Sequence, residues 1–188
     1  MTKTGMRGGA AVLGLACALA AQCAAAADES MDSGAVRLIR NIATGSTNQV
    51  AVVAYGAGAR KCAARIDLVT NFLTKGTQSS ALLFLPDKDP DSGMVSVSME
   101  VKAESLPRAY ASATFSPNAA ADCASEYETV QYWAEACNTV AAKRFTGATP
   151  SGSVGGEIAI LTIGPSARVF LMRSTATSCV SIKKEVLK

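Results

Sequence analysis

Four widely spaced cysteines constrain the fold of this chain more than any other feature of its sequence. They are Cys62, Cys123, Cys137 and Cys179. An even number of cysteines in an exported protein indicates a disulfide framework, so we expect two bridges. Histidine is missing from the 188 residues and the cysteine spacings are too wide for a zinc knuckle, so a mixed Cys/His metal site is excluded. Each bridge would close a long loop and contribute about 3–4 kcal/mol to stability.

Residues 1–27 have the three parts of a secretory signal peptide. Lys3 and Arg7 give a positive start, residues 10–21 are apolar, and residues 25–27 are alanines that suit cleavage. The apolar run is shorter than the ~20 residues of a spanning helix. We therefore expect cleavage, no transmembrane segment in the mature chain, and a periplasmic or secreted location.

The mature chain is predicted to be one domain with little net charge. Residues 28–34 are small and polar and predict a flexible leader, followed by a single domain over 35–188. The full chain carries 18 Lys and Arg against 15 Asp and Glu, and two of the basic residues lie in the signal peptide. This balance gives no electrostatic footprint for nucleic acid, which we exclude as a partner.

Hydrophobic periodicity predicts two helices among many short strands. The helices are expected over 60–75 and 134–145, and the strands over 48–55, 80–85, 94–101, 108–115, 124–133, 157–163, 168–172 and 178–186. Residues 35–43 suit a short helix or a strand, and the glycine-rich residues 147–156 are expected to be a loop. Short connections between neighbouring strands predict an α+β fold, a mostly antiparallel sheet with two main helices packed on one face.

The predicted strands also bear on the disulfide pairing. A strand between Cys123 and Cys137 would hold these two cysteines about 25 Å apart at about 3.3 Å per residue. In a simple up-and-down trace, the start of the helix over 60–75 and the end of the strand over 108–115 lie at one end of the sheet, so we favour Cys62–Cys123 and Cys137–Cys179. Pairing of Cys123 with Cys137 is the alternative if the intervening chain folds back.

The stretch LPDKDPDSGMV places Asp87, Asp89 and Asp91 at alternating positions, as in a calcium loop. Such a loop needs glycine at its sixth position and a bidentate acid at its twelfth. Counted from Asp87, these positions hold Ser92 and Ser98. Asp, Pro, Ser and Gly between two strands also compose ordinary hairpin turns. We therefore predict a hairpin tip without a metal, one that can contact a partner.

Residues 56–61 (GAGARK) resemble a phosphate-cradling turn between a strand and a helix. The sixth position of the dinucleotide fingerprint is Lys61 rather than glycine or alanine, and an exported protein seldom meets dinucleotides. An ordinary turn is therefore preferred, and no cofactor is expected.

Three of the ten aromatic residues lie together as Tyr127, Tyr132 and Trp133. Tyr and Trp are enriched at the centres of protein interfaces, which makes this segment a candidate contact surface. The alternative is that Trp133 and one tyrosine fill the core beneath the second helix.

Candidates for catalysis are few because the chain has no histidine to serve as a general base. Glu126 and Glu128 alternate on a predicted strand, so their side chains point the same way and a glycosidase-like pair is conceivable. Two acids on an exposed strand are more often simply solvated. We expect no catalytic residues and no enzymatic activity.

In size and class, though not by any motif, the chain is similar to small periplasmic lysozyme inhibitors and immunity proteins. That similarity implies a non-catalytic module that binds another protein of the envelope or its surroundings. The contact elements expected for it are the aspartate turn, the Tyr127 to Trp133 segment and the loop over 147–156. A self-associating structural or colonisation-related envelope protein and a histidine-free hydrolase are the two alternatives.

Overall fold

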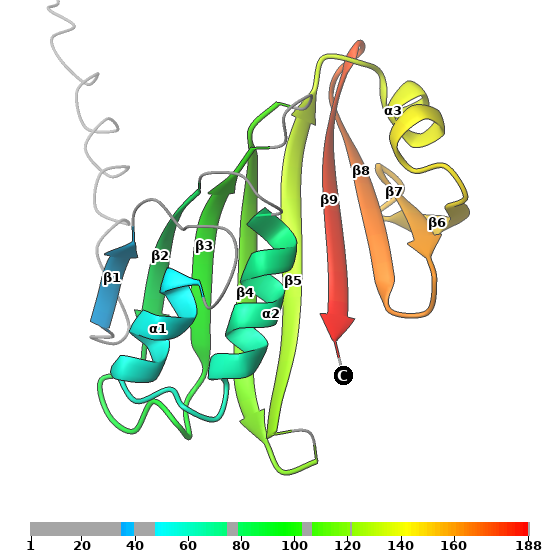
Figure 1. Ribbon diagram of the computed structural model, residues 1–188. Coiled ribbons are helices and arrows are strands. Elements are labelled where there is room, and N and C mark those ends of the chain that lie inside the picture. Colours follow the sequence, from blue (N-terminus) through cyan, green and yellow to red (C-terminus); the bar gives the residue numbers. More distant parts are fainter. Residues whose placement is uncertain (1–34, 40–47, 75–78, 103–106, 121, 188) are drawn as a thin grey trace, which may run out of the picture. The chain divides into compact units, whose positions relative to one another are not determined.

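The computed structural model describes residues 35–39, 48–74, 79–102, 107–120 and 122–187 (Figure 1). The predicted signal peptide and the leader over 28–34 lie outside the described residues. The described strands form one antiparallel sheet in the order β1-β2-β3-β4-β5-β9-β8-β7-β6. They are β1 (Ala35–Ile39), β2 (Ser80–Leu85), β3 (Val95–Val101), β4 (Ala109–Asn118), β5 (Asp122–Trp133), β6 (Thr149–Val154), β7 (Ile158–Ile163), β8 (Ala167–Thr175) and β9 (Ser178–Leu187).

Three short helices accompany the sheet in the described part of the chain, so the fold is mostly β rather than clearly the predicted α+β. They are α1 (Gln49–Gly56), α2 (Ala63–Thr74) and α3 (Cys137–Arg144). The antiparallel sheet, the helices expected over 60–75 and 134–145, and two disulfides are confirmed. The prediction of two main helices was incomplete, because α1 is a third helix of the same length as α3.

The strand predicted over 48–55 was wrong, because this segment forms α1. Its alternating valines suggested a strand, but Asn48 caps a helix by accepting the Ala51 amide proton at 3.1 Å. Val50, Ala51 and Ala54 then turn to one side and are buried. The Asn48 amide group also donates to Thr70 Oγ1 in α2 at 2.5 Å, which fixes α1 to α2. Tertiary burial thus overrides the strand propensity of valine.

The loop predicted over 147–156 was also wrong in part, because residues within it form the edge strand β6. All six residues of β6 are exposed, and the pairing with β7 shifts register between Pro150 and Gly152. Proline and an irregular register are features of edge strands, which have one unpaired side. The polar composition of this segment therefore reflects its edge position.

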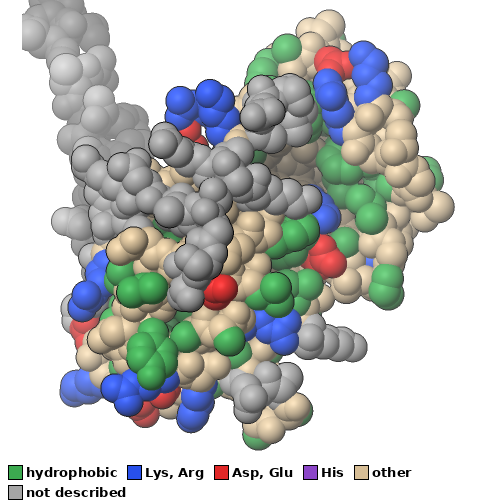
Figure 2. All heavy atoms as spheres, viewed as in Figure 1, with side chains coloured by type: hydrophobic (Ala, Val, Ile, Leu, Met, Phe, Trp, Pro, Cys, Tyr) green, Lys and Arg blue, Asp and Glu red, His purple; other side chains and the backbone are tan. Residues whose placement is uncertain are grey.

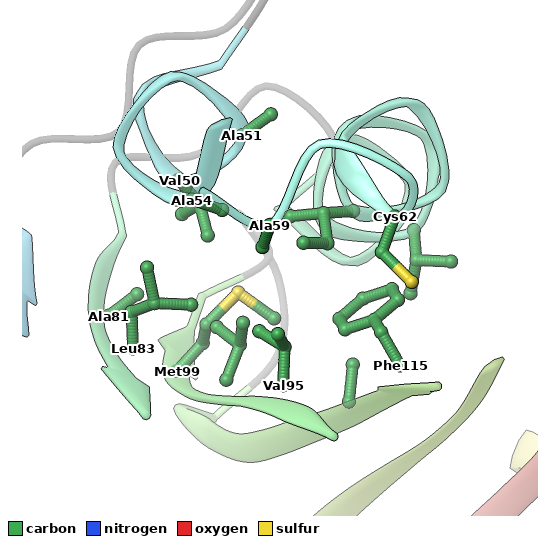
Figure 3. Packing of buried hydrophobic residues seen from close by; sticks show 14 of the residues in the cluster. Val50, Ala51, Ala54, Ala59, Cys62, Ala81, Leu83, Val95, Met99 and Phe115 are labelled. Atoms are coloured by element: carbon green, nitrogen blue, oxygen red, sulfur yellow. The ribbon is translucent and has the colours of Figure 1, made fainter. Parts of the chain in front are cut away.

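The main core lies between α1, α2 and strands β2 to β5 (Figure 1). Alternate residues of the strands point into it, including Leu83, Val97 and Phe115, each almost wholly buried. Ile66 of α2 meets them from the other side, and Figure 3 shows the helices packed over these strands. This arrangement explains the period-two pattern of the strands and the helical stripe of α2.

A second, smaller cluster lies beneath α3. It comprises Trp133, Val140, Leu161, Val169, Leu171 and Cys179. Trp133 donates its indole proton to Ser181 Oγ at 2.7 Å, and the Arg144 guanidinium lies 4.9 Å from the centre of the indole rings. The strand register places these buried strand residues on the same face of the sheet as the main core.

Apart from β1 and α1, which have no counterpart in the second half, the two halves of the sheet repeat each other in topology and meet at β5 and β9. In each half a helix precedes four strands, and α2 contacts β4 and β5 as α3 contacts β8 and β9. Cys62 before α2 is bonded to Cys123 near the start of β5, and Cys137 at the start of α3 is bonded to Cys179 near the start of β9. These bridges confirm the favoured pairing. They are also consistent with an exported protein.

Candidate functional site

The face of the sheet opposite the two clusters carries two adjacent rows of apolar side chains. We call this face the open face; it consists of the even-numbered residues of β2 to β5 and β7 to β9, together with Val154 of β6. The first row comprises Tyr110, Val130, Ile182, Phe170 and Ile160, each paired with the next across neighbouring strands. The second row comprises Tyr132, Val180, Met172, Ile158 and Val154. Together they form a continuous patch.

Several side chains of this patch remain accessible. Tyr110 is 47% exposed, Tyr132 54% and Met172 40%. The buried apolar side chains of α1, α2 and α3 belong to the two clusters on the opposite face, so among the described residues no helix has a buried apolar side chain on the patch. Exposed apolar patches of more than a few hundred Å² are uncommon on monomeric proteins.

A charged row runs beside the patch on the open face. Glu128 of β5 pairs in register with Lys184 of β9, which in turn pairs with Arg168 of β8. Lys184 forms an ion pair with Glu126 at 3.1 Å, and Glu128 accepts a hydrogen bond from Ser112 at 3.2 Å. The acid therefore lies on one side of the β5–β9 boundary and the two bases lie on the other.

A pocket of about 510 Å³ extends the patch beyond its Tyr110 end, over β2, β3 and β4. Leu82 and Tyr110 line it, and the Tyr110 hydroxyl lies 2.9 Å from Ser98 Oγ. Arg108 and Glu100 form an ion pair at its margin. The pocket is thus apolar within and polar at its rim, which suits a projecting apolar group.

The opposite face, shown in Figure 2, carries basic and acidic side chains between hydrophobic ones. Three of its groups form a polar cluster on β5 and β9. Tyr127 donates to Glu185 Oε2 at 2.5 Å, and Lys183 donates to the Tyr127 oxygen at 2.9 Å. Burial raises the pKa of Tyr127, as do its hydrogen bond to Glu185 and the charge of that carboxylate. The phenol is therefore a proton donor that joins two strands, rather than a general base.

The three clustered aromatic residues of β5 lie on different faces. Tyr127 and Trp133 point toward the helices and are buried, whereas Tyr132 points to the open face. Trp133 therefore fills the core, which was the alternative prediction for it. Phe72 of α2 packs against Tyr127, with 5.6 Å between the centres of the two rings. Tyr132 is the one member of the three in the apolar patch.

The aspartate turn joins β2 to β3 as a hairpin, as predicted. Asp91 accepts the backbone proton of Lys61 at 2.8 Å, beside Cys62 and the start of α2. Ser92 donates to Asp89 at 2.5 Å, which closes the turn on itself. Within the described part of the chain, no three His, Cys, Asp or Glu side chains gather as metal ligands.

Gly93 follows this turn for a reason unrelated to metal binding. A Cβ atom at this position would lie 2.4 Å from Cγ of Pro86, closer than real contacts allow. The glycine therefore permits the two ends of the hairpin to approach. Pro90 of the same hairpin lies next to Gly58, because a Cβ atom added to this glycine would be 3.6 Å from the Pro90 ring.

The glycine-rich turn over 56–61 connects α1 to α2 rather than a strand to a helix. The backbone amide of Lys61, which was a candidate to meet an anion, donates to the Asp91 carboxylate. Arg60 lies over the Tyr55 ring at 5.7 Å. A carboxylate of the protein itself thus takes the place that a bound anion would occupy.

Glu126 and Glu128 point the same way, as predicted, and lie on the open face. The ten residues of the two apolar rows were not predicted, apart from Tyr132. The sequence feature that could have indicated these rows is the pair of apolar runs ILTI in β7 and VFLM in β8, where residues on both faces of the strand are apolar. Such runs usually indicate a strand covered on both sides.

No protein-family model, curated protein or solved structure matches the chain. Among the described residues, no helix is both long and apolar enough to cross a membrane.

Proposed function

We propose that this chain is an exported, non-catalytic protein-binding module that acts in the periplasm or outside the cell. The observation that carries the proposal is the pair of apolar rows on the open face, with exposed Tyr132 and Met172 among them. Aromatic residues and methionine are enriched at protein interfaces. The pocket beside Tyr110 supplies a hollow into which an apolar side chain of a partner can insert.

The alternative of a histidine-free hydrolase has less support. Glu126 forms an ion pair with Lys184, and Glu128 accepts a hydrogen bond from Ser112, so both residues connect neighbouring strands.

The open face is expected to be rigid, because two disulfides join its central strands, β5 and β9, to the helical segments on the opposite face. A rigid surface of this kind limits the entropy lost on binding.

Two substitutions on the open face, Tyr132→Glu and Met172→Glu, test this proposal. Each puts a charge into the apolar patch at a side chain that is already exposed, so the fold should be kept. Leu68→Glu is the matched control, because Leu68 is an exposed apolar residue of α2 at 61%. When an envelope extract is passed over the immobilised proteins, the wild type and the Leu68 variant should retain the same stoichiometric partner. The two open-face variants should lose that partner. Equal retention by all four proteins would refute the proposal.

A further inference from the structure

We infer that the open face binds a second copy of this chain, through a two-fold axis that runs parallel to the strands between β5 and β9. The inference rests on the proposed function and names its partner. Stacked sheets in proteins pack face to face at about 10 Å with their strands nearly aligned. A two-fold axis in the plane between two such sheets makes an interface in which one surface meets itself.

The strand order makes the open face complementary to itself under this rotation. The axis places β5 over β9 of the second copy and β4 over β8, because these strands lie at equal distances on either side of the boundary. Each cross-strand row then lies over the same row of the second copy. Across the four central strands, Val130 therefore faces Ile182 and Tyr110 faces Phe170, so apolar side chains meet there. At the end of this row, Ile160 of β7 lies over Glu100 of β3.

The charged row is also complementary to itself, because an acidic residue of one copy faces a basic residue of the other. Glu128 of β5 comes to lie over Lys184 of the second copy, in β9. Arg168 of β8 extends the basic side of this row. The Glu128–Lys184 contact occurs twice because the interface is symmetric.

The area of the face is adequate for a stable dimer. Seven strands at about 4.8 Å and three rows at about 6.7 Å cover about 700 Å², close to the ~800 Å² that each partner of a standard interface buries. The two apolar rows over five strands account for about 300 Å² of this area. The charged row and the pocket over β2 to β4 must therefore also be covered. Under the same axis, the pocket lies over β6 to β8, with Phe170 opposite Tyr110 and Ile160 opposite Glu100.

A pair of charge-reversal variants tests this geometry. One chain carries Glu128→Lys, and the other carries Lys184→Glu together with Arg168→Glu. Each variant alone brings like charges together at both symmetric contacts, whereas the mixed pair restores both acid–base contacts. We expect light scattering to show a dimer for the wild type and for the equimolar mixture. Each variant alone should dissociate at a concentration about tenfold or more higher, since like charges across an interface are unfavourable by several kcal/mol.

The mixture also serves as the folding control, because a dimer forms from two variants only if both are folded. A wild type that stays monomeric over a wide concentration range, variants that dimerise as well as the wild type, or a mixture that stays monomeric would each overturn the inference. Loss of a different captured protein in Tyr132→Glu, with a monomeric wild type, would leave the proposed function standing and refute the second copy as its partner. Failure of both experiments would refute both proposals.

Discussion

Tyr127 in β5 donates its phenolic proton to the Glu185 carboxylate in β9 across 2.5 Å, at the boundary where the two halves of the sheet meet. Glu185 also forms an ion pair with Lys183 at 3.4 Å and accepts a hydrogen bond from Ser166 at 3.3 Å. The pKa of Glu185 is lowered, mainly by the hydrogen bond from Tyr127 and further by the charge of Lys183, whereas burial opposes the shift. This cluster links strands that are 58 residues apart in sequence.

We expect Tyr127→Phe to lower the free energy of unfolding at neutral pH by about 1–2 kcal/mol, since a hydrogen bond to a charged group is lost. Because the folded pKa of Glu185 is lowered, its contribution is present above the unfolded value of about 4.3 and is lost as the pH falls through the folded value. The difference between wild type and variant should therefore shrink below about pH 4. Urea unfolding over a pH series measures it, and a constant difference from pH 7 to pH 3 would contradict the role of Glu185.

The same substitution makes a separate prediction at alkaline pH. Burial raises the folded pKa of Tyr127, so its protonated form stabilises the fold below the unfolded pKa of about 10, and this contribution is lost as the pH rises further. Wild-type stability should fall above pH 10 more steeply than that of Tyr127→Phe, by up to about 1.4 kcal/mol per pH unit. Tyr132→Phe is the control, because this tyrosine lies exposed on the same strand. Parallel alkaline curves for wild type and Tyr127→Phe would show that Tyr127 does not titrate as proposed.

The turn between β2 and β3 should respond to substitution as a structural clamp rather than as a metal site. Asp91→Ala removes the acceptor of the Lys61 amide and should lower stability by about 1 kcal/mol, whereas Asp91→Asn keeps a side-chain oxygen and should lower it less. Gly93→Ala should be more harmful, at about 1–3 kcal/mol, because of the close approach of Pro86. Thermal melting measures all three. A rise in wild-type melting temperature with millimolar calcium would restore the metal interpretation.

Most of the strands were predictable, because burial on one face imposes a period of two on sequences such as that of β3. Strand length argued against Cys123–Cys137, and an up-and-down chain trace then favoured the pairing that the structure has. The helix α1 was missed although its cap, from Asn48 to Ala51, is local, because the burial of Asn48 depends on a hydrogen bond to Thr70 of α2, 22 residues away. Pattern reasoning cannot supply such a distant contact.

The site was harder to predict than the fold. Tyr132 and Trp133 are neighbours in sequence, but the pleat sends them to opposite faces, and only the register with β9 shows which face holds the core. The apolar rows come from strands that are distant in the chain, such as β4 and β7. Their continuity depends on the reversed order in which the second half of the sheet joins the first. No local signal encodes that order.

The two disulfides are expected to stabilise the protein to a similar extent. They span 61 and 42 residues, and the loop-entropy relation gives about 4 kcal/mol for either length. Replacing Cys62 and Cys123 together by serine should therefore lower the free energy of unfolding about as much as replacing Cys137 and Cys179. Urea unfolding of the two double variants provides the measurement. If one variant were as stable as wild type, the corresponding bridge would not restrain the unfolded chain.

Adjacent residues Trp133 and Tyr132 should differ sharply when each is replaced by alanine. Trp133 is 6% exposed, packs beneath α3 and donates to Ser181, so Trp133→Ala should lower the free energy of unfolding by about 3–5 kcal/mol. Tyr132→Ala should change it by about 0.5 kcal/mol or less at concentrations where the chain is monomeric, since its ring projects from the open face. Far-UV circular dichroism in urea compares both variants, and the chain's single tryptophan reports on the Tyr132 variant by fluorescence. Equal destabilisation would mean that Tyr132 is covered by another part of the chain, and the open face would then not be free to bind.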